Sequence, residues 1–69
     1  MARAYRDAPE AARALKAEGW RQRFTNRLAF DKKLDSGETL HALIYRAAGP
    51  GFAPPQEGDA VRVEVWSGG

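Results

Sequence analysis

A chain of 69 residues with a formal net charge of +2 and no cysteine is long enough for one small domain, and it excludes disulfides and thiolate metal sites. No segment is apolar enough to be a signal peptide or to cross a membrane, so we expect a cytoplasmic protein without a membrane partner. A core of this size supplies only about 3–5 kcal/mol of net stability, so a homo-oligomer is an alternative to a lone monomer.

The first predicted element is a helix over residues 8–18. Asp7 is a suitable N-cap, Pro9 fits the first turn, and Glu10 follows the cap by three residues. Alanine and leucine then recur at helical spacing, and Gly19 can end the helix in a left-handed conformation. The narrow alanine stripe predicts a helix that packs closely on a sheet.

Three strands and one long loop are predicted after the helix. The strands cover residues 20–34, 38–47 and 60–66, and a loop rich in proline and glycine covers residues 48–59. Gly37 suits a three-residue hairpin loop that needs a positive φ angle. Residues 1–69 are therefore predicted to form a single α+β domain, with one short N-terminal helix packed on a three-stranded antiparallel sheet.

The first predicted strand alternates between an apolar face and a basic face. Trp20, Phe24 and Phe30 occupy its even positions, so we expect all three rings in the core beneath the helix. Gln22 and Asn26 interrupt this apolar face, which leaves a bulge or a break near Asn26 as an open alternative.

The sequence offers little for catalysis or for binding a metal or cofactor. His41 is the only histidine, there is no cysteine nucleophile, and the acidic residues lack a spacing that would bring two together over a substrate. No glycine-rich loop precedes a helix, as phosphate binding would require. We therefore expect a protein that is not an enzyme, with His41 as an ordinary strand side chain.

The main functional hypothesis is a nucleic-acid-binding surface on the sheet face that the helix leaves uncovered. Odd positions of the first strand would carry basic side chains about 7 Å apart, close to the spacing of successive phosphates. Aromatic rings beside them would stack on bases, as in sheets that bind single-stranded RNA or DNA. The candidate residues are Arg21, Arg23, Arg27, Lys33, Tyr45 and Trp66. The partner would be single-stranded RNA or DNA, or a ribonucleoprotein. The alternative for the arginines is an ordinary solvated face on which acids of other strands pair with them.

A protein-interaction role fits the same sequence. So short a chain leaves sheet edges unpaired, and another chain can add a strand to such an edge. The proline-rich loop can present Phe52 as an aromatic anchor, with Trp66 as a second interface residue. An accessory subunit or a small regulator of a larger assembly is therefore the alternative function.

The end of the chain reads EGDAVRVEVWSGG and resembles the end of the ubiquitin-like sulfur-carrier proteins, in which a Gly-Asp turn leads to a last strand and a Gly-Gly terminus. The resemblance implies that the carboxylate of Gly69 is activated by adenylation and accepts sulfur. It covers about one-fifth of the chain. The rest differs, because that family places a helix where this chain has its proline-rich loop. A C-terminal Gly-Gly carrier protein is the minor alternative.

Overall fold

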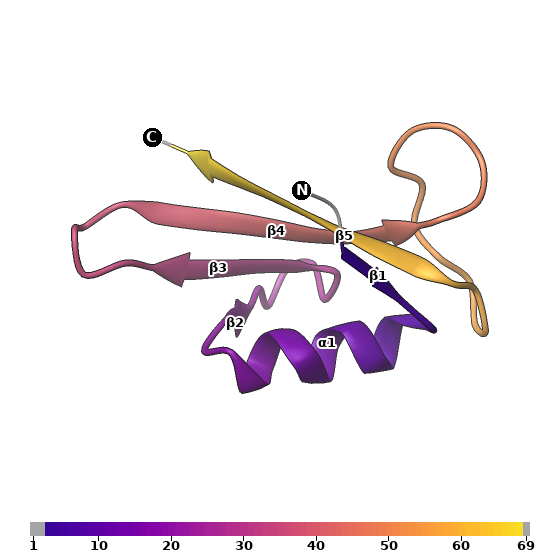
Figure 1. The fold of residues 1–69 in the computed structure, drawn as a ribbon, viewed down its shortest axis with the longest axis horizontal. Coiled ribbons are helices and arrows are strands. Elements are labelled where there is room, and N and C mark those ends of the chain that lie inside the picture. Colours follow the sequence, from indigo (N-terminus) through magenta and orange to yellow (C-terminus); the bar gives the residue numbers. More distant parts are fainter. Residues whose placement is uncertain (1–2, 69) are drawn as a thin grey trace.

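The computed structural model describes residues 3–68 and, within them, contains one helix and five strands. In chain order the elements are β1 (Arg3–Tyr5), α1 (Ala8–Ala17), β2 (Arg21–Gln22), β3 (Ala29–Lys33), β4 (Thr39–Arg46) and β5 (Val61–Gly68). The strands form one antiparallel sheet in the order β1-β5-β4-β3-β2, and α1 lies along one side of it (Figure 1). The chain is a small α+β domain as expected, but the expected three-stranded sheet is wrong.

The two ends of α1 follow the local signals in the sequence. The side chain of Asp7 accepts a hydrogen bond from the backbone N–H of Glu10 at 2.9 Å. At the other end Gly19 has a φ angle of +93°, and the backbone N–H of Trp20 donates to the carbonyl of Leu15 at 3.0 Å. This is a Schellman motif, which provides partners for helix carbonyls that would otherwise lack them.

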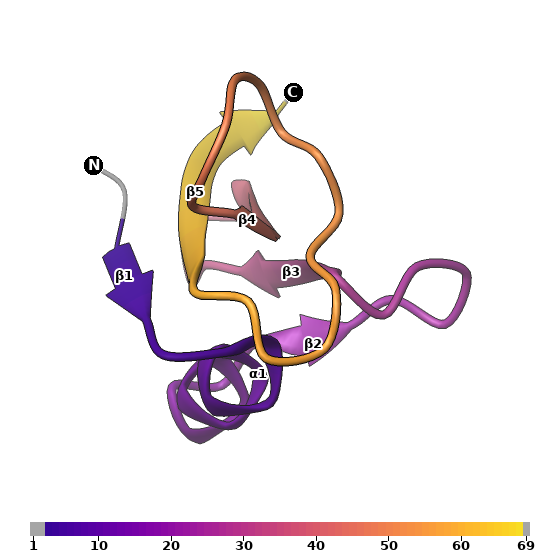
Figure 2. The ribbon, with the colours of Figure 1, turned by 90° about the vertical axis from the view of Figure 1, so that its right-hand side faces the viewer.

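The expected strand over residues 20–34 is interrupted. A loop of residues 23–28 separates β2 from β3 and projects from the side of the sheet (Figure 2). Asn26 makes the turn, because its side-chain oxygen accepts from the N–H of Leu28 and its carbonyl accepts from the N–H of Ala29, both at 3.0 Å. Such local hydrogen bonds compete with the hydrogen bonds of a sheet. The break was the alternative that the polar residues left open.

This break separates the three aromatic residues that the alternation had placed together. Trp20 and Phe30 are buried, with 7% and 0% of their surface exposed, as predicted. Phe24 is 95% exposed, so its predicted burial is wrong. The physical reason is that Phe24 has left the strand and no longer points to either face of the sheet.

The sequence pattern predicts no strand at residues 3–5, yet these residues form β1. Ala4 lies opposite Arg62 of β5, and its two neighbours are also paired with β5. Three residues are too few to show an alternation, so β1 exists because β5 offers an edge with which it can pair.

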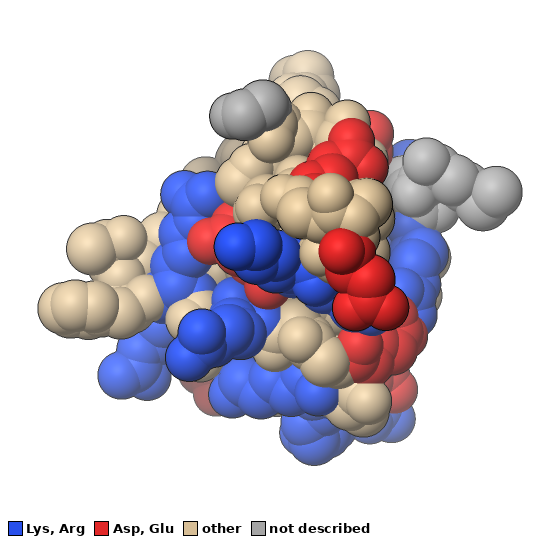
Figure 3. Space-filling view, turned by 90° about the vertical axis from the view of Figure 1, so that its left-hand side faces the viewer, with Lys and Arg blue, Asp and Glu red and all other residues tan. Residues whose placement is uncertain are grey.

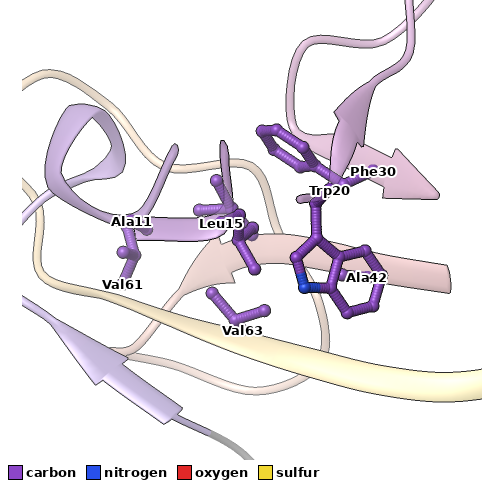
Figure 4. Close-up of a cluster of buried hydrophobic side chains, with 8 residues drawn as sticks. Ala11, Leu15, Trp20, Phe30, Ala42, Val61 and Val63 are labelled. Atoms are coloured by element: carbon purple, nitrogen blue, oxygen red, sulfur yellow. The ribbon is translucent and has the colours of Figure 1, made fainter. Parts of the chain in front are cut away.

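A single apolar cluster fills the space between α1 and one face of the sheet (Figure 4). Ala11 and Leu15 of α1 lie against Val61 and Val63 of β5 in this view. The buried members are Ala11, Leu15, Trp20, Phe30, Ala42, Ile44, Val61 and Val63. The opposite face of the sheet is not covered by the helix.

The long loop between β4 and β5 folds back on β4. The backbone N–H of Arg46 donates to the carbonyl of Ala53 at 2.8 Å, and its guanidinium pairs with Asp59 at 3.2 Å. The ring of Phe52 contacts the ring of Tyr45 edge-on, with centroids 4.8 Å apart. Residues 47–60 contain no helix, which is a difference from the sulfur-carrier architecture.

The turn between β3 and β4 confirms the predicted three-residue loop. Gly37 has a φ angle of +94°, and the N–H of Leu34 donates to the carbonyl of Glu38 across the loop at 2.8 Å. Only glycine adopts this φ angle without a steric cost, which explains the residue at this position.

Candidate interaction surface

The strand register places a row of polar and aromatic side chains across the uncovered face. Residues directly opposite one another on neighbouring strands point to the same side of a sheet. Such partners run from β2 to β5 in the order Arg21, Asp31, His41 and Trp66. The next row on the same face holds Ala29, Leu43 and Glu64, and the third holds Tyr45 and Arg62.

Asp31 is the centre of a hydrogen-bonded cluster in the first row. Arg23 donates to both of its carboxylate oxygens, at 2.9 and 3.0 Å. The Nδ1 atom of His41 lies 2.6 Å from Oδ1 of Asp31 and donates to it, because an ionised carboxylate only accepts. The bonds from Arg23 and then from His41 lower the pKa of Asp31. Asp31 therefore stays ionised and neutralises Arg23.

A shallow pocket lies beside this cluster. It has a volume of about 300 Å³ and is lined by Leu43, Phe52, Glu64 and Trp66. Phe52 and Trp66 are 61% and 45% exposed, and the ring of Trp66 lies 5.8 Å from that of His41. Glu64 makes no ion pair with any residue between 3 and 68. The pocket therefore presents an apolar, partly aromatic surface, and Glu64, one of its lining residues, has no ion-pair partner within these residues.

The loop between β2 and β3 carries a third exposed aromatic side chain, that of Phe24. Phe24 lies at its start, between Arg23 and Arg27 in the sequence. Arg21 and Arg27 are both exposed and form no ion pair within the described part of the chain. The loop is thus an apolar ring among guanidinium groups, with no acidic residue from Trp20 to Phe30.

Four of the residues predicted to bind nucleic acid lie on the uncovered face, and three of them, Arg21, Lys33 and Trp66, are exposed there. Arg21 and Trp66 lie at the two ends of the first row. Lys33 follows Asp31 by two residues on β3 and therefore points to the same side. These three side chains are exposed, so they remain available to a ligand.

The other three are not available in the way the sequence predicted. Arg23 is held by Asp31, and Arg27 lies in the loop and not on a strand. Tyr45 is only 9% exposed because the ring of Phe52 covers it. The predicted line of three arginines along one strand is therefore absent, for the same reason that Phe24 is exposed.

Basic and acidic side chains are mixed at the end of the molecule where α1 ends and β3 turns into β4 (Figure 3). The elements at this end carry the basic residues Lys16, Arg21, Lys32 and Lys33 and the acidic residues Glu18, Asp31, Asp35 and Glu38. Acidic side chains therefore interrupt part of the basic surface at this end of the molecule.

Sequence reasoning did not identify Phe24, Leu43 and Glu64 as candidate site residues. Leu43 and Glu64 lie on different strands, and only the register between β4 and β5 brings them together. For Phe24 a signal existed, because Asn26 and the other polar residues around it are typical of a turn.

The C-terminal glycines were the basis of the carrier alternative. Gly68 is paired with Thr39 at the end of β5, and a Cβ atom there would lie 2.6 Å from the ring of His41. Glycine at position 68 therefore has a packing reason within the sheet. Gly69, whose carboxylate the carrier alternative requires, lies outside the described residues.

The structure and the comparisons with known proteins place few further limits on function. Between residues 3 and 68, no three His, Asp or Glu side chains are grouped so that they could hold a metal ion. In the same range no helix has the length and apolar character needed to span a bilayer. No protein family, curated protein or solved structure matches the chain.

Proposed function

We propose that this chain is a non-catalytic cytoplasmic protein-binding module that holds an apolar side chain of its partner against the uncovered face of the sheet. The observation that carries the proposal is the pocket between Leu43, Phe52 and Trp66. Most of the binding energy of a protein interface comes from a few such anchors, above all aromatic side chains in pockets.

The apolar lining of the pocket favours a side chain of a protein over the phosphate backbone of a nucleic acid. Glu64, one of the lining residues, makes no ion pair between residues 3 and 68, and its carboxylate beside the pocket would repel a phosphate. Arg23, which the sequence predicted to contact phosphates, is already paired with Asp31. A partner that presents a basic residue beside its apolar anchor fits both features.

The size of the pocket fits one side chain. A volume of about 300 Å³ is at the lower end of the range for ligand sites, and it is large enough for a phenylalanine, leucine or methionine. Burying such a side chain contributes roughly 1.5–3 kcal/mol. Because a micromolar complex needs about 8 kcal/mol, the partner must also contact the surrounding strands.

A peptide selection tests this proposal. A random peptide library displayed on phage is panned against the Phe24→Ala protein, which has an intact pocket. We expect the enriched peptides to carry an aromatic or large aliphatic residue next to lysine or arginine. Synthetic versions should bind at least about tenfold more weakly to a Trp66→Ala variant, a loss typical of an interface anchor. The wild-type protein is the matched control, because its additional exposed ring lies outside the pocket.

Tryptophan fluorescence gives an independent measurement of the same binding. Trp20 is buried and Trp66 is 45% exposed, so a peptide that covers the pocket should shift the emission of Trp66 to shorter wavelength. Enriched peptides that bind the Trp66→Ala variant as tightly as the parent would contradict the proposal.

Binding of single-stranded nucleic acid, free or in a ribonucleoprotein, is a second candidate, favoured by Phe24 between exposed arginines. The ring would stack on a base while Arg21 and Arg27 contact phosphates. Anisotropy of labelled single-stranded RNA and DNA at about 50 and 200 mM salt should then show a steep loss of affinity with salt. An Arg21/Arg27→Ala variant should bind more weakly, whereas Arg6/Arg13→Ala, with the same change in charge, should not. No binding at low salt would eliminate this candidate.

A further inference from the structure

We infer that the partner of the pocket is a second copy of this chain, which inserts the Phe24 ring of its own β2–β3 loop between Phe52 and Trp66. This inference rests on the proposed function of the pocket. The partner is identified from the exposed aromatic ring and the basic residue that the β2–β3 loop of this chain presents.

The loop supplies what the pocket requires. The pocket has an apolar, partly aromatic lining to which Glu64 contributes, so it suits an apolar side chain that has a basic neighbour. Phe24 is 95% exposed and Arg27 is three residues away in the same loop. Arg27 and Glu64 both lack an ion-pair partner between residues 3 and 68, so each would gain one across the interface.

The loop does not fill the pocket of its own chain. Phe24 makes almost no contact within the molecule, and the loop extends away from the sheet (Figure 2). The pocket lies on β4, β5 and the loop that joins them, beyond β3 from this loop. A second molecule is therefore needed to bring the ring and the pocket together.

The position of the loop favours a closed dimer over a filament. The N–H of Arg23 donates to the carbonyl of Ala29, which lies opposite Leu43 of the pocket. The loop and the pocket are thus parts of one continuous surface. A two-fold axis between them would let each copy insert its ring into the other, which closes the assembly.

The dimer should be weak. Two loops of this length bury less surface than a standard interface of about 1,600 Å², so we expect a dissociation constant in the micromolar range or above. Sedimentation velocity from about 1 μM to 1 mM should therefore show a monomer that becomes a dimer as concentration rises. Phe24→Ala and Leu43→Lys should each remain monomeric, since one lacks the ring and the other blocks the pocket.

A mixture of these two variants is the decisive experiment. Phe24→Ala keeps the pocket and Leu43→Lys keeps the loop, so one of the two contacts can form between them. With Phe24→Ala labelled with ¹⁵N, adding unlabelled Leu43→Lys should shift the indole N–H signal of Trp66. With the labels exchanged, the signals of residues 23–28 should shift. Far-ultraviolet circular dichroism of each variant checks that it is folded.

A charge exchange tests the pairing of Arg27 with Glu64. Arg27→Glu alone and Glu64→Arg alone should each weaken the dimer by about threefold or more. The doubly exchanged protein should return to within about twofold of the wild type, because the pair is restored with opposite polarity. Additive weakening in the double variant would mean that these two residues do not meet.

The outcomes separate this inference from the function on which it rests. If the wild type stays monomeric and the mixture shows no shifts while selected peptides still bind the pocket, the second copy is eliminated and the protein-binding function stands. If selected peptides fail as well, both are overturned. A dimer that persists in Phe24→Ala would place the interface elsewhere. If Phe24→Ala loses RNA binding but its oligomeric state is the same as that of the wild type, the β2–β3 loop binds nucleic acid and not a second copy.

Discussion

Phe24 and Phe30 have the same phase in the sequence alternation, and the structure predicts opposite consequences for replacing them. Phe30 has no exposed surface and lies in the core cluster. Removing its ring loses the transfer free energy and leaves a cavity, at a cost of about 3–5 kcal/mol. That is comparable to the entire net stability of a core of this size, about 3–5 kcal/mol. Phe30→Ala should therefore be largely unfolded, whereas Phe24→Ala should change the free energy of unfolding by less than about 0.5 kcal/mol.

Urea titration followed by the fluorescence of buried Trp20 measures this difference. Phe30→Leu is included because it keeps the core apolar and should cost no more than about 1.5 kcal/mol, which leaves a measurable folded state. The samples are kept below about 1 μM so that self-association does not contribute to the free energy of unfolding. The typical point substitution lowers the free energy of unfolding by about 1 kcal/mol. A larger loss in Phe24→Ala, or no loss in Phe30→Leu, would refute the assignment of the exposed and the buried ring.

The buried Tyr5 hydroxyl has no hydrogen-bond partner between residues 3 and 68. Tyr5→Phe should therefore leave the free energy of unfolding unchanged or raise it by about 1 kcal/mol, and the thermal midpoint should stay the same or rise accordingly. A lower midpoint would show that the hydroxyl is satisfied. Gly19→Ala should lower the stability in urea by about 1 kcal/mol, because Gly19 has a φ angle of +93°; an unchanged midpoint would argue against strain at the end of α1. The pKa of Asp31 is lowered, mainly by its hydrogen bonds from Arg23. The ionised carboxylate therefore stabilises the fold at pH values above the pKa of an ordinary aspartate, and this contribution is lost as the pH falls below about 4. On going from neutral pH to about pH 3, Asp31→Asn should therefore lose less stability than the wild type. The difference between the two losses should be only a few tenths of a kcal/mol, because the ion pair is exposed to solvent. Identical pH profiles would contradict this role of the carboxylate.

The elements that could be predicted from the sequence are those whose signals are local. Asp7 and Gly19 define the ends of α1 through hydrogen bonds within a few residues. Gly37 likewise determines the turn between β3 and β4. The alternation of valines from Val61 to Val65 predicted a strand with one buried face, and β5 is that strand. Each of these predictions depends on backbone conformations and side-chain periods that a short segment determines by itself.

The elements that could not be predicted depend on contacts between distant segments. β1 has only three residues and is a strand because it pairs with β5. The cluster of Asp31 with His41, and the pocket that joins Leu43 to Trp66, exist because of the register between β3, β4 and β5. A shift of one residue in that register would send these side chains to opposite faces of the sheet.

The sequence by itself determined a small α+β domain with a capped helix, a glycine turn and one alternating strand near the end of the chain, because these features are encoded within single segments. The tertiary structure decided which aromatic rings are core and which are available to a partner. Phe24 and Phe30 differ in this respect because Asn26 forms a turn between them, and because only β3 continues into the sheet. The free energy of pairing a strand with its neighbours, and not the alternation of its own residues, determined where each strand ends.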